Sequence, residues 1–218
     1  MKETHTAPIG RREERRLERR RTILAVAAQS FLENGYDGTT MSGISAMLGG
    51  SKGTLWNHFS SKEELFETFL DEATAVFKQE LMTILEPSRD LRPALETFTQ
   101  RFIQKISLPD SIKLYRLVVG ESGRSPEVGS IFYARAPGAV ESILARFLED
   151  HMKAGRLRED DPIAAGRFIL AQCTGGDHQR MLCGGPALDP DRARGHALKI
   201  VEIFMRLYAP EQSPKPSA

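Results

Sequence analysis

Apolar residues recur at helical spacing along almost the whole chain, and this pattern restricts the possible folds more than any other feature. After Arg11, Leu17, Leu24 and Phe31 follow one another every seven residues, with arginine and glutamate between them. No stretch of the sequence alternates apolar and polar residues in the way a half-buried strand does. Glycines and prolines separate the apolar stretches and mark the ends of helices. The sequence therefore predicts an all-α fold.

These breaks predict a short N-terminal head of three helices followed by a longer helical bundle. Head helices are expected over residues 11–34, 41–48 and 52–58, and a long helix over 62–85 leads out of the head. In the bundle we expect helices over 91–106, from Pro109, from Ser125 to Gly155 with a break near Pro137, over 162–182 and over 190–208. Residues 1–10 and 209–218 lack an apolar pattern and are expected to be disordered. The predicted domains are 11–62 and 63–208.

Charge is distributed unevenly, although the chain as a whole is nearly neutral. The 218 residues contain 30 Lys and Arg against 29 Asp and Glu. Residues 1–62 hold 10 basic and 6 acidic side chains, whereas residues 63–218 hold 20 and 23. A basic head on an acidic body favours a head that faces nucleic acid.

The sequence predicts neither a secretory signal nor a membrane span. Its first residues lack the apolar core of a signal peptide, and no apolar run approaches the ~18 residues of a span. Two cysteines, Cys173 and Cys183, are too few for a disulfide framework, and low cysteine use is typical of a reducing compartment. We expect a cytoplasmic protein with no membrane partner.

The two short helices expected at 41–48 and 52–58 have the lengths and the tight turn of a helix-turn-helix. In that motif the second helix enters the major groove of DNA, and the start of a following helix can hold a phosphate. Lys52, Trp56 and Asn57 lie on the second helix, and Lys62 lies in the first turn of the next. Such side chains donate hydrogen bonds to phosphate oxygens or to base edges. The basic stretch 11–21 offers a further contact to the DNA backbone.

Each of these features also has a structural interpretation. Short helix pairs occur in many bundles, Trp56 fits a core position, and His58 fits a core or capping position. The arginines of residues 11–21 alternate with Glu13, Glu14 and Glu18, as on a solvated helix face. A phosphate-binding P-loop is excluded because residues 49–54 lack the required order of glycine and lysine and no strand precedes them.

A specific pattern runs through residues 20–70 without gaps. Its members are Phe31, Gly35, Tyr36, Thr39, Thr40, Ile44, Gly49, the run SKGTLWNHF at 51–59 and KEEL at 62–65. This pattern resembles the N-terminal signature of TetR-family transcriptional regulators. The resemblance implies a helix-turn-helix whose DNA-facing residues are Thr40, Ser42, Ser51, Lys52, Gly53, Thr54, Trp56, Asn57, His58 and Lys62. Trp56 stands where the family usually has tyrosine, so an indole N–H replaces the phenolic donor, and Ser42 stands where a basic residue is frequent.

The C-terminal part, from Leu114 to Gly185, is similar to the AefR-like group of the family. The resemblance implies a bundle that binds a small effector and dimerises through its last two helices. Candidate effector-binding residues are Phe98, Phe102, Tyr115, Phe132, Phe147, Phe168, Gln172 and His178. Candidate dimer-interface residues are Ala165, Ile169, Ile200, Val201, Phe204 and Tyr208, and an intramolecular core is the alternative interpretation of these six.

An enzyme is the least favoured function class. Cys173, His178 and Cys183 are five residues apart, so on one helix they would point about 140° away from one another and not converge on a metal. We expect no catalytic site, no metal and no cofactor. The sequence predicts a homodimeric regulator of transcription, most simply a repressor that an apolar effector releases from an inverted-repeat operator. An activator and a helical adaptor with a degenerate helix-turn-helix are the alternatives.

Overall fold

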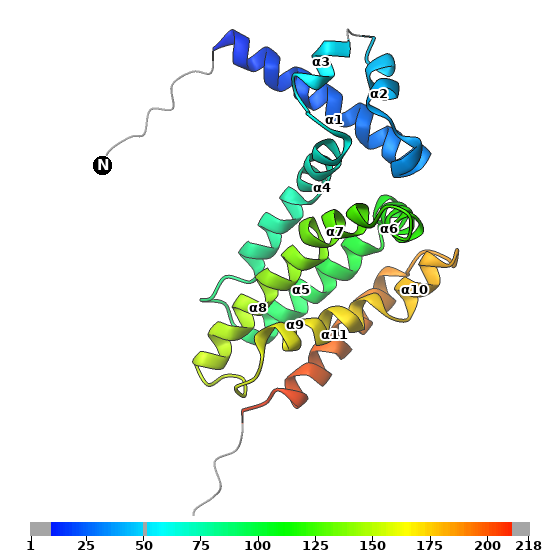
Figure 1. The fold of residues 1–218 in the computed structure, drawn as a ribbon. Helices are drawn as coiled ribbons and strands as arrows, with labels where there is room; N and C mark the ends of the chain where they lie inside the picture. The colour runs from blue at the N-terminus through cyan, green and yellow to red at the C-terminus, as the bar shows by residue number, and fades with distance from the viewer. Residues whose placement is uncertain (1–9, 50–51, 211–218) are drawn as a thin grey trace, which may run out of the picture.

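The computed structural model describes residues 10–49 and 52–210, and within these residues every regular element is a helix (Figure 1). The predicted all-α fold is confirmed. The helices are α1 (Arg11–Gly38), α2 (Met41–Met47), α3 (Lys52–Trp56), α4 (Lys62–Ile84), α5 (Leu91–Ile106), α6 (Pro109–Glu121), α7 (Pro126–Arg135), α8 (Pro137–Lys153), α9 (Pro162–Thr174), α10 (Asp177–Leu182) and α11 (Pro190–Leu207).

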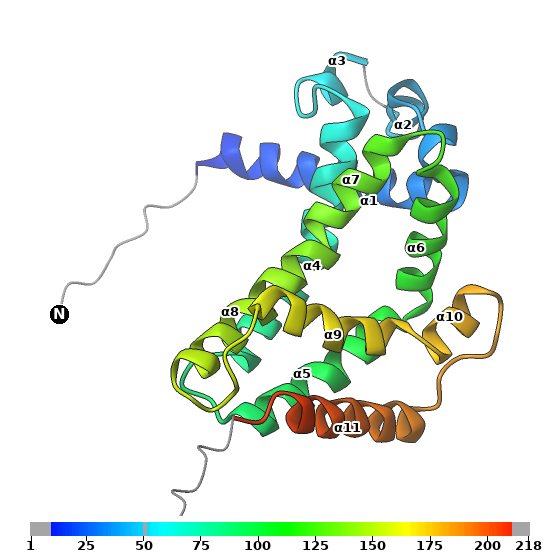
Figure 2. The same ribbon diagram turned by 60° about the horizontal axis from the view of Figure 1, so that its bottom comes forward.

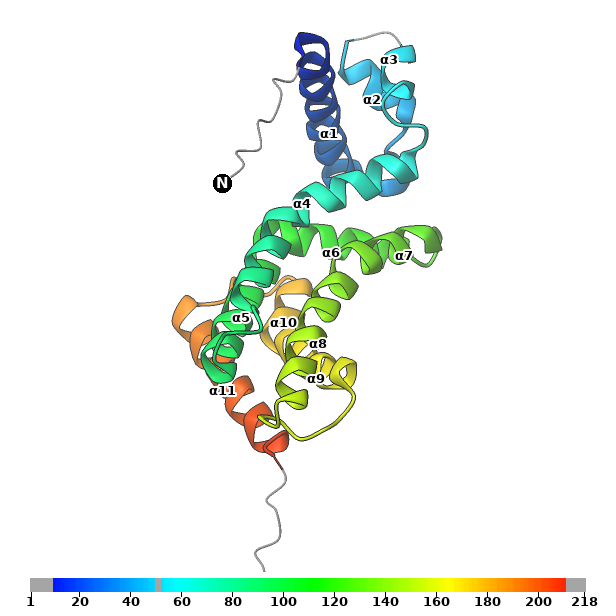
Figure 3. The same ribbon diagram turned by 90° about the vertical axis from the view of Figure 1, so that its left-hand side faces the viewer.

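The head consists of α1, α2 and α3 packed on the first turns of α4 (Figure 3). Its centre is an aromatic cluster in which the ring of Phe66 meets Phe31 at 5.0 Å and Tyr36 at 5.2 Å, both edge-on. Helix α1 loses helical geometry at Gly35, where φ is +78°. This break, predicted from Asn34-Gly35, turns Tyr36 back into the cluster, where it is fully buried.

Helix α4 belongs to both parts of the molecule. Its N-terminal half buries Leu65, Phe66 and Leu70 in the head, and Leu81 near its other end is buried in the body. Figure 1 shows α4 leaving the head and running down into the bundle. The head therefore extends beyond residue 62, into the helix that we assigned from sequence to the second domain.

The body is a bundle in which α5 packs on α11 and α8 packs on α9 (Figure 2). Helices α8 and α9 are in close contact at Gly166, where an added Cβ would meet the Leu144 side chain at 3.7 Å, an ordinary van der Waals distance. Helices α6 and α7 lie between this bundle and the head, with α6 packed on α1 and α7 on α4.

Several boundaries differ from the predictions. The helix predicted over 162–182 is divided into α9 and α10 at Gly176, where φ is +50°, a value that only glycine adopts readily. Helix α3 ends at Trp56, so Asn57 and His58 lie in the turn that follows it. Leu17, predicted to face inward, is 37% exposed because the first turns of α1 extend beyond the head. Most of the two predicted disordered ends, 1–9 and 211–218, lies outside the described residues.

Within the described residues, no helix has the length and apolar character needed to cross a membrane.

Candidate functional site

The helix-turn-helix is held in place by a small number of buried side chains. Thr40 is the N-cap of α2, and its Oγ1 accepts a hydrogen bond of 3.0 Å from the backbone N–H of Gly43. Ile44 of α2 and Leu55 of α3 are buried in the head, as is Phe59 just after α3. With these residues inside, the opposite faces of both short helices point to solvent.

The predicted DNA-facing residues lie mainly on that outer face. Ser42, Gly53 and Asn57 are exposed, and Trp56 is 42% exposed, which rules out a core position for the indole. Thr54 is half-buried. The backbone of Lys52 begins α3, whereas Ser51 lies outside the described residues.

Arginines of α1 approach the end of α3. Arg20 donates a hydrogen bond of 3.0 Å to the backbone carbonyl of His58, and its guanidinium lies 4.1 Å from the centre of the Phe59 ring. Burial lowers the pKa of His58, and the nearby charges of Arg16 and Arg20 lower it further. The sequence indicated a basic stretch or a solvated helix face over residues 11–21. The contacts of Arg20 were missed, since helical spacing does not show which arginine faces α3.

Lys62 lies at the start of α4, beside the head. Its ammonium donates a hydrogen bond of 3.0 Å to the backbone carbonyl of Tyr36 and lies 4.0 Å from the centre of the Tyr36 ring. The preceding Ser61 caps α4 by accepting a hydrogen bond from the N–H of Glu64. An ammonium group has three N–H donors, so the Tyr36 carbonyl leaves donors of Lys62 available to a phosphate.

The body contains a cavity of about 810 Å³ between α4, α5, α6, α7, α8 and α9, with His178 of α10 at one side. Four of the eight predicted effector-binding residues line it, namely Phe102, Tyr115, Phe132 and His178. Val119 and Tyr133 also line it and are 61% and 51% exposed, so the cavity opens to solvent beside them.

The other four predicted effector-binding residues lie away from this cavity. Phe98 and Phe147 are buried in the body core, and Phe168 packs on Phe204 and Tyr208. Gln172 is exposed on α9. A helical stripe shows that a side chain points inward, but not which of several neighbouring helices it meets there.

A single carboxylate joins the cavity wall to the head. Glu121, the last residue of α6, accepts hydrogen bonds from the backbone N–H groups of Tyr36 (2.8 Å) and Asp37 (3.1 Å). Ser125 adds a hydrogen bond of 2.9 Å to the Asp37 carboxylate. Residues of the same helix, α6, line the cavity. No motif in the sequence predicted this connection, because Glu121 is 85 residues from Tyr36 and 84 residues from Asp37 along the chain.

Comparison with known proteins agrees with this arrangement. Residues 93–210 match the family profile of the AefR-like transcriptional repressor C-terminal domain, and residues 23–69 match that of bacterial regulatory proteins of the tetR family. The chain belongs to the TetR family of transcriptional regulators. This family consists of DNA-binding regulators, and the predicted resemblance is confirmed.

Relatives and solved structures of the TetR family match over most of the chain. The chain is 26% identical to the transcriptional repressor AcnR of Corynebacterium diphtheriae, over 88% of this chain and 94% of that protein. It is 25% identical to the regulator YhgD of Bacillus subtilis, over 67% of this chain and 75% of that protein. The structure of the flavonoid-responsive regulator FrrA superposes with a TM-score of 0.78 at 28% identity, covering 89% of this chain and 99% of FrrA.

The six predicted dimer-interface residues of this TetR-family protein do not lie on its surface. Each is at most 8% exposed, and all belong to the single core of the body: Ala165, Ile169, Ile200, Val201, Phe204 and Tyr208. The intramolecular interpretation is therefore the correct one for them. Other apolar residues of the same helices are exposed, namely Ile163 on α9 and Leu198, Ile203 and Leu207 on α11. At 100° per residue, Leu198 and Ile203 flank the buried stripe of α11 on its two sides. The apolar stripe that the sequence shows on α11 is the face of this helix that is buried in the core.

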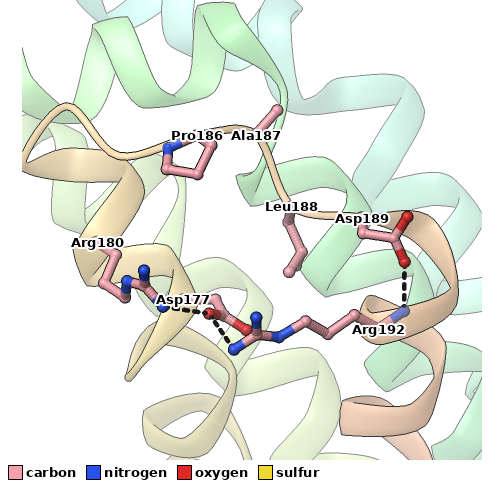
Figure 4. A pocket seen from close by; sticks show the side chains of 7 residues that line it. All are labelled: Asp177, Arg180, Pro186, Ala187, Leu188, Asp189 and Arg192. Atoms are coloured by element: carbon pink, nitrogen blue, oxygen red, sulfur yellow. Dashed lines mark hydrogen bonds and ion pairs between the residues drawn. The ribbon is translucent and has the colours of Figure 1, made fainter.

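A second, smaller pocket of about 110 Å³ lies between α10 and the start of α11 (Figure 4). Asp177 there pairs with Arg192 at 2.9 Å and with Arg180 at 3.8 Å. Asp189 caps α11 by accepting a hydrogen bond from the backbone N–H of Arg192. The Asp177–Arg192 ion pair joins α10 to the start of α11 in this TetR-family protein. Across the described residues, no three His, Cys, Asp or Glu side chains form a metal-ligand set.

Proposed function

We propose that this TetR-family regulator is a homodimeric repressor, released from an inverted-repeat operator when a small, largely apolar effector enters the cavity of its body. The observation that carries the proposal is the physical continuity of α6, which lines the cavity and ends in the carboxylate that holds the head. A ligand that displaces α6 would act directly on the position of the helix-turn-helix.

DNA recognition is assigned to the outer face of α2, α3 and the turn after α3. We propose that Lys52, Trp56 and Asn57 contact the major groove and its phosphates, and that Lys62 contacts a phosphate from the start of α4. The remaining proposed contacts come from Thr40, Ser42, Ser51, Gly53, Thr54 and His58. The exposure of Trp56 and Asn57 supports this assignment.

The exposed apolar residues of α9 and α11 support a homodimer. Neighbouring helices from two protomers would form a four-helix interface that buries Ile163, Leu198, Ile203 and Leu207. A two-fold dimer places two recognition helices on half-sites about 34 Å apart, which is why an inverted repeat is expected.

The effector acts by preferring one arrangement of the heads. A ligand that binds more tightly to the arrangement that cannot bind DNA lowers operator affinity by the same factor, and couplings of about 1–3 kcal/mol are typical. Helix α4 also lines the cavity, through Phe69, Ala73 and Phe77, and continues into the head. Both α4 and α6 are therefore routes for the effect.

Relatives support a ligand-responsive regulator. FrrA is described as flavonoid-responsive, and SmeT, which shares this fold at a TM-score of 0.65, was solved as a complex with triclosan. AcnR is a repressor, whereas FasR of Mycolicibacterium smegmatis, 35% identical over 85 residues, is an activator. Repression is proposed because the C-terminal profile is that of a repressor.

The experiment is selection of binding sites by the purified protein from a random duplex pool at two salt concentrations. Enrichment of an inverted repeat whose affinity falls steeply with salt would support the proposed dimer on an operator. Enrichment of a single half-site would contradict the dimer, and no enrichment in either salt would contradict binding without effector. Transcription from a promoter carrying the selected site then distinguishes repression from activation.

A further inference from the structure

The first turns of α1 lie outside the head core. The first buried residue of this helix is Ile23, whereas residues 11–18 are all exposed. Figures 1 and 3 show these turns projecting from the head, at the end of the molecule where α3 also lies. Packing inside the head therefore does not account for the side chains of residues 11–18.

Three arginines near the start of α1 lie on one face of the helix. Arg12, Arg16 and Arg19 follow one another at spacings of four and three residues. At 100° per residue, this places them within about 60° around the helix axis. Glu14 and Glu18 lie more than about 100° from the centre of the group. We call the surface formed by the three arginines the arginine face.

The arginine face leads toward the turn after α3. Arg20, which lies beside this face, donates a hydrogen bond of 3.0 Å to the backbone carbonyl of His58. Burial lowers the pKa of His58, and the charges of Arg16 and Arg19 are among those that lower it further. The arginine face is therefore continuous with the turn at residues 57–58, which is part of the proposed DNA-facing surface.

The positive charges of this face repel one another. Arg12 and Arg16 are four residues apart, and like charges at this spacing destabilise a helix. Glu13 lies 3.9 Å from the Arg16 guanidinium, but both side chains are more than half exposed, and an ion pair of this kind contributes little. An anion bound on the face would relieve the repulsion. A row of phosphates matches both the charge and the planar fork of each guanidinium.

We propose that the arginine face binds successive phosphates of one DNA strand, beside the groove that α3 enters. This inference rests on the proposed function, since it extends the DNA-facing surface of the head to α1. The stretch from Arg12 to Arg19 spans about 10 Å of helix, the axial length of about three base pairs. Contacts to phosphates position a protein on DNA but carry no sequence information. The arginine face therefore adds affinity and salt dependence to DNA binding, and leaves base preference to α3.

The first test removes the three charges together, in the variant Arg12→Gln, Arg16→Gln, Arg19→Gln. Glutamine has nearly the helix propensity of arginine, so α1 should remain helical, which circular dichroism checks. Fluorescence anisotropy over a salt series measures binding to the selected duplex. We expect the slope of log affinity against log salt to shrink by about three, because each lost phosphate contact removes about 0.9. An unchanged slope would overturn the proposal and leave this face to a partner other than DNA.

A second triple variant removes the same charge from other parts of the protein. Arg21→Gln on the far side of α1, Lys113→Gln on α6 and Arg146→Gln on α8 all change exposed positions. Net charge falls equally in the two triple variants, so a difference between their slopes reports local contacts. We expect this control to keep a slope close to that of the natural protein. An equal reduction in both variants would contradict a contact made by the arginine face.

The second test locates the phosphates, by ethylation interference on the selected duplex. We expect about three adjacent phosphates in each half-site at which ethylation weakens binding of the natural protein but not of the triple arginine variant. Lys62→Ala should lose sensitivity at a different phosphate. A loss that is spread evenly over the duplex, or that coincides with the phosphate of Lys62, would overturn the assignment.

Failure of this inference and failure of the proposed function give different results. An enriched operator whose salt slope does not depend on the three arginines would support the proposed function and contradict this inference. Binding to any duplex with an arginine-dependent slope, but without an enriched operator, would support the arginine face and contradict the proposed operator. Selection of a different sequence by the triple arginine variant would contradict a contact to phosphates alone. Absence of DNA binding by the natural protein would contradict both.

Discussion

At the scale of single residues, Gly35 and Glu121 connect the head to the body. Gly35 takes a φ of +78°, and this brings the N–H groups of Tyr36 and Asp37 onto the Glu121 carboxylate. A Cβ at position 35 would collide with Oε1 of Glu121. The glycine is therefore required both for its backbone conformation and for the space that the carboxylate occupies.

Replacement of Gly35 tests this connection. We expect Gly35→Ala to lower the free energy of unfolding by more than about 1 kcal/mol, because alanine is strained at positive φ and displaces Glu121. Urea denaturation followed by circular dichroism measures the change. The control is Gly120→Ala, next to Glu121 on α6, where an added Cβ meets open space; this variant should be as stable as the natural protein or more so. Similar losses in both variants would contradict the explanation.

A second residue of consequence is His151, which is fully buried in the body beside the Phe147 ring. The Arg156 side chain donates a hydrogen bond of 2.7 Å to its Nδ1, so that nitrogen is unprotonated. Burial lowers the pKa of His151, and the charge of Arg156 lowers it further. Protonation would break this bond and place two cations side by side.

The consequence is a loss of stability in mild acid. An unfolded histidine titrates near pH 6.5, whereas His151 in the folded state titrates lower. Below pH 6.5 the unfolded state therefore binds more protons, and stability falls with decreasing pH by at most about 1.4 kcal/mol per pH unit for one group. We expect His151→Gln to reduce the slope of unfolding free energy against pH between 7 and 5, as measured by urea denaturation. His196→Gln is the control, and an equal slope in His151→Gln and the natural protein would count against this role.

At the scale of elements, the head depends on α4 as much as on the two short helices. The start of α4 supplies the cap at Ser61 and the ammonium of Lys62, which is bound to the Tyr36 carbonyl. Its following turns bury Phe66 and Leu70 in the head core. A contact between Lys62 and DNA would therefore join the DNA backbone to the element that also lines the effector cavity.

Lys62→Ala tests that contact. We expect DNA affinity to fall by a similar factor for all sequences, and the slope of log affinity against log salt to shrink by about one, because one phosphate contact is lost. Lys113→Ala removes an exposed charge on α6, away from the proposed DNA face, and should leave the slope unchanged. Fluorescence anisotropy over a salt series gives both values. A Lys62→Ala slope equal to that of the natural protein would show that this lysine only supports Tyr36.

At the scale of the whole molecule, the distribution of apolar residues on α9 and α11 suggests how two chains meet. Both helices bury one face in the body core and leave large apolar side chains exposed beside it, one on α9 and three on α11. An exposed leucine is common on protein surfaces, but several on neighbouring helices indicate an interface. The dimer proposed for this chain buries these exposed side chains.

Charge introduced at these exposed positions of α11 should separate the protomers. We expect the double variant Leu198→Glu, Ile203→Glu to sediment as a monomer, since two carboxylates per chain would be buried without partners. Operator affinity should then fall by about 100-fold or more, because the two half-sites no longer bind as one unit. Val76→Glu, on a residue of α4 that is 82% exposed, is the control and should remain dimeric. A dimeric double variant would place the interface elsewhere.

Local patterns were sufficient to predict most elements. The chemistry of single residues predicts four helix starts, and the structure has helices that begin at Pro109, Pro126, Pro162 and Pro190. The break in α1 at Gly35 also lies where it was expected. Half of the predicted effector-binding residues line the cavity. The division of the helix predicted over 162–182 was missed because the pair Gly175-Gly176 is compatible with either a helix or a turn.

The sequence by itself determined the all-α fold, the helix-turn-helix and the family, because each depends on neighbours within a few turns of the chain. The tertiary structure alone decided which face of α11 is core, which aromatic residues enclose the cavity, and that Glu121 binds the head. These features arise from contacts between helices that are distant in sequence. Helical periodicity gives the direction of a side chain around its own axis, whereas the partner it meets depends on how the helices pack.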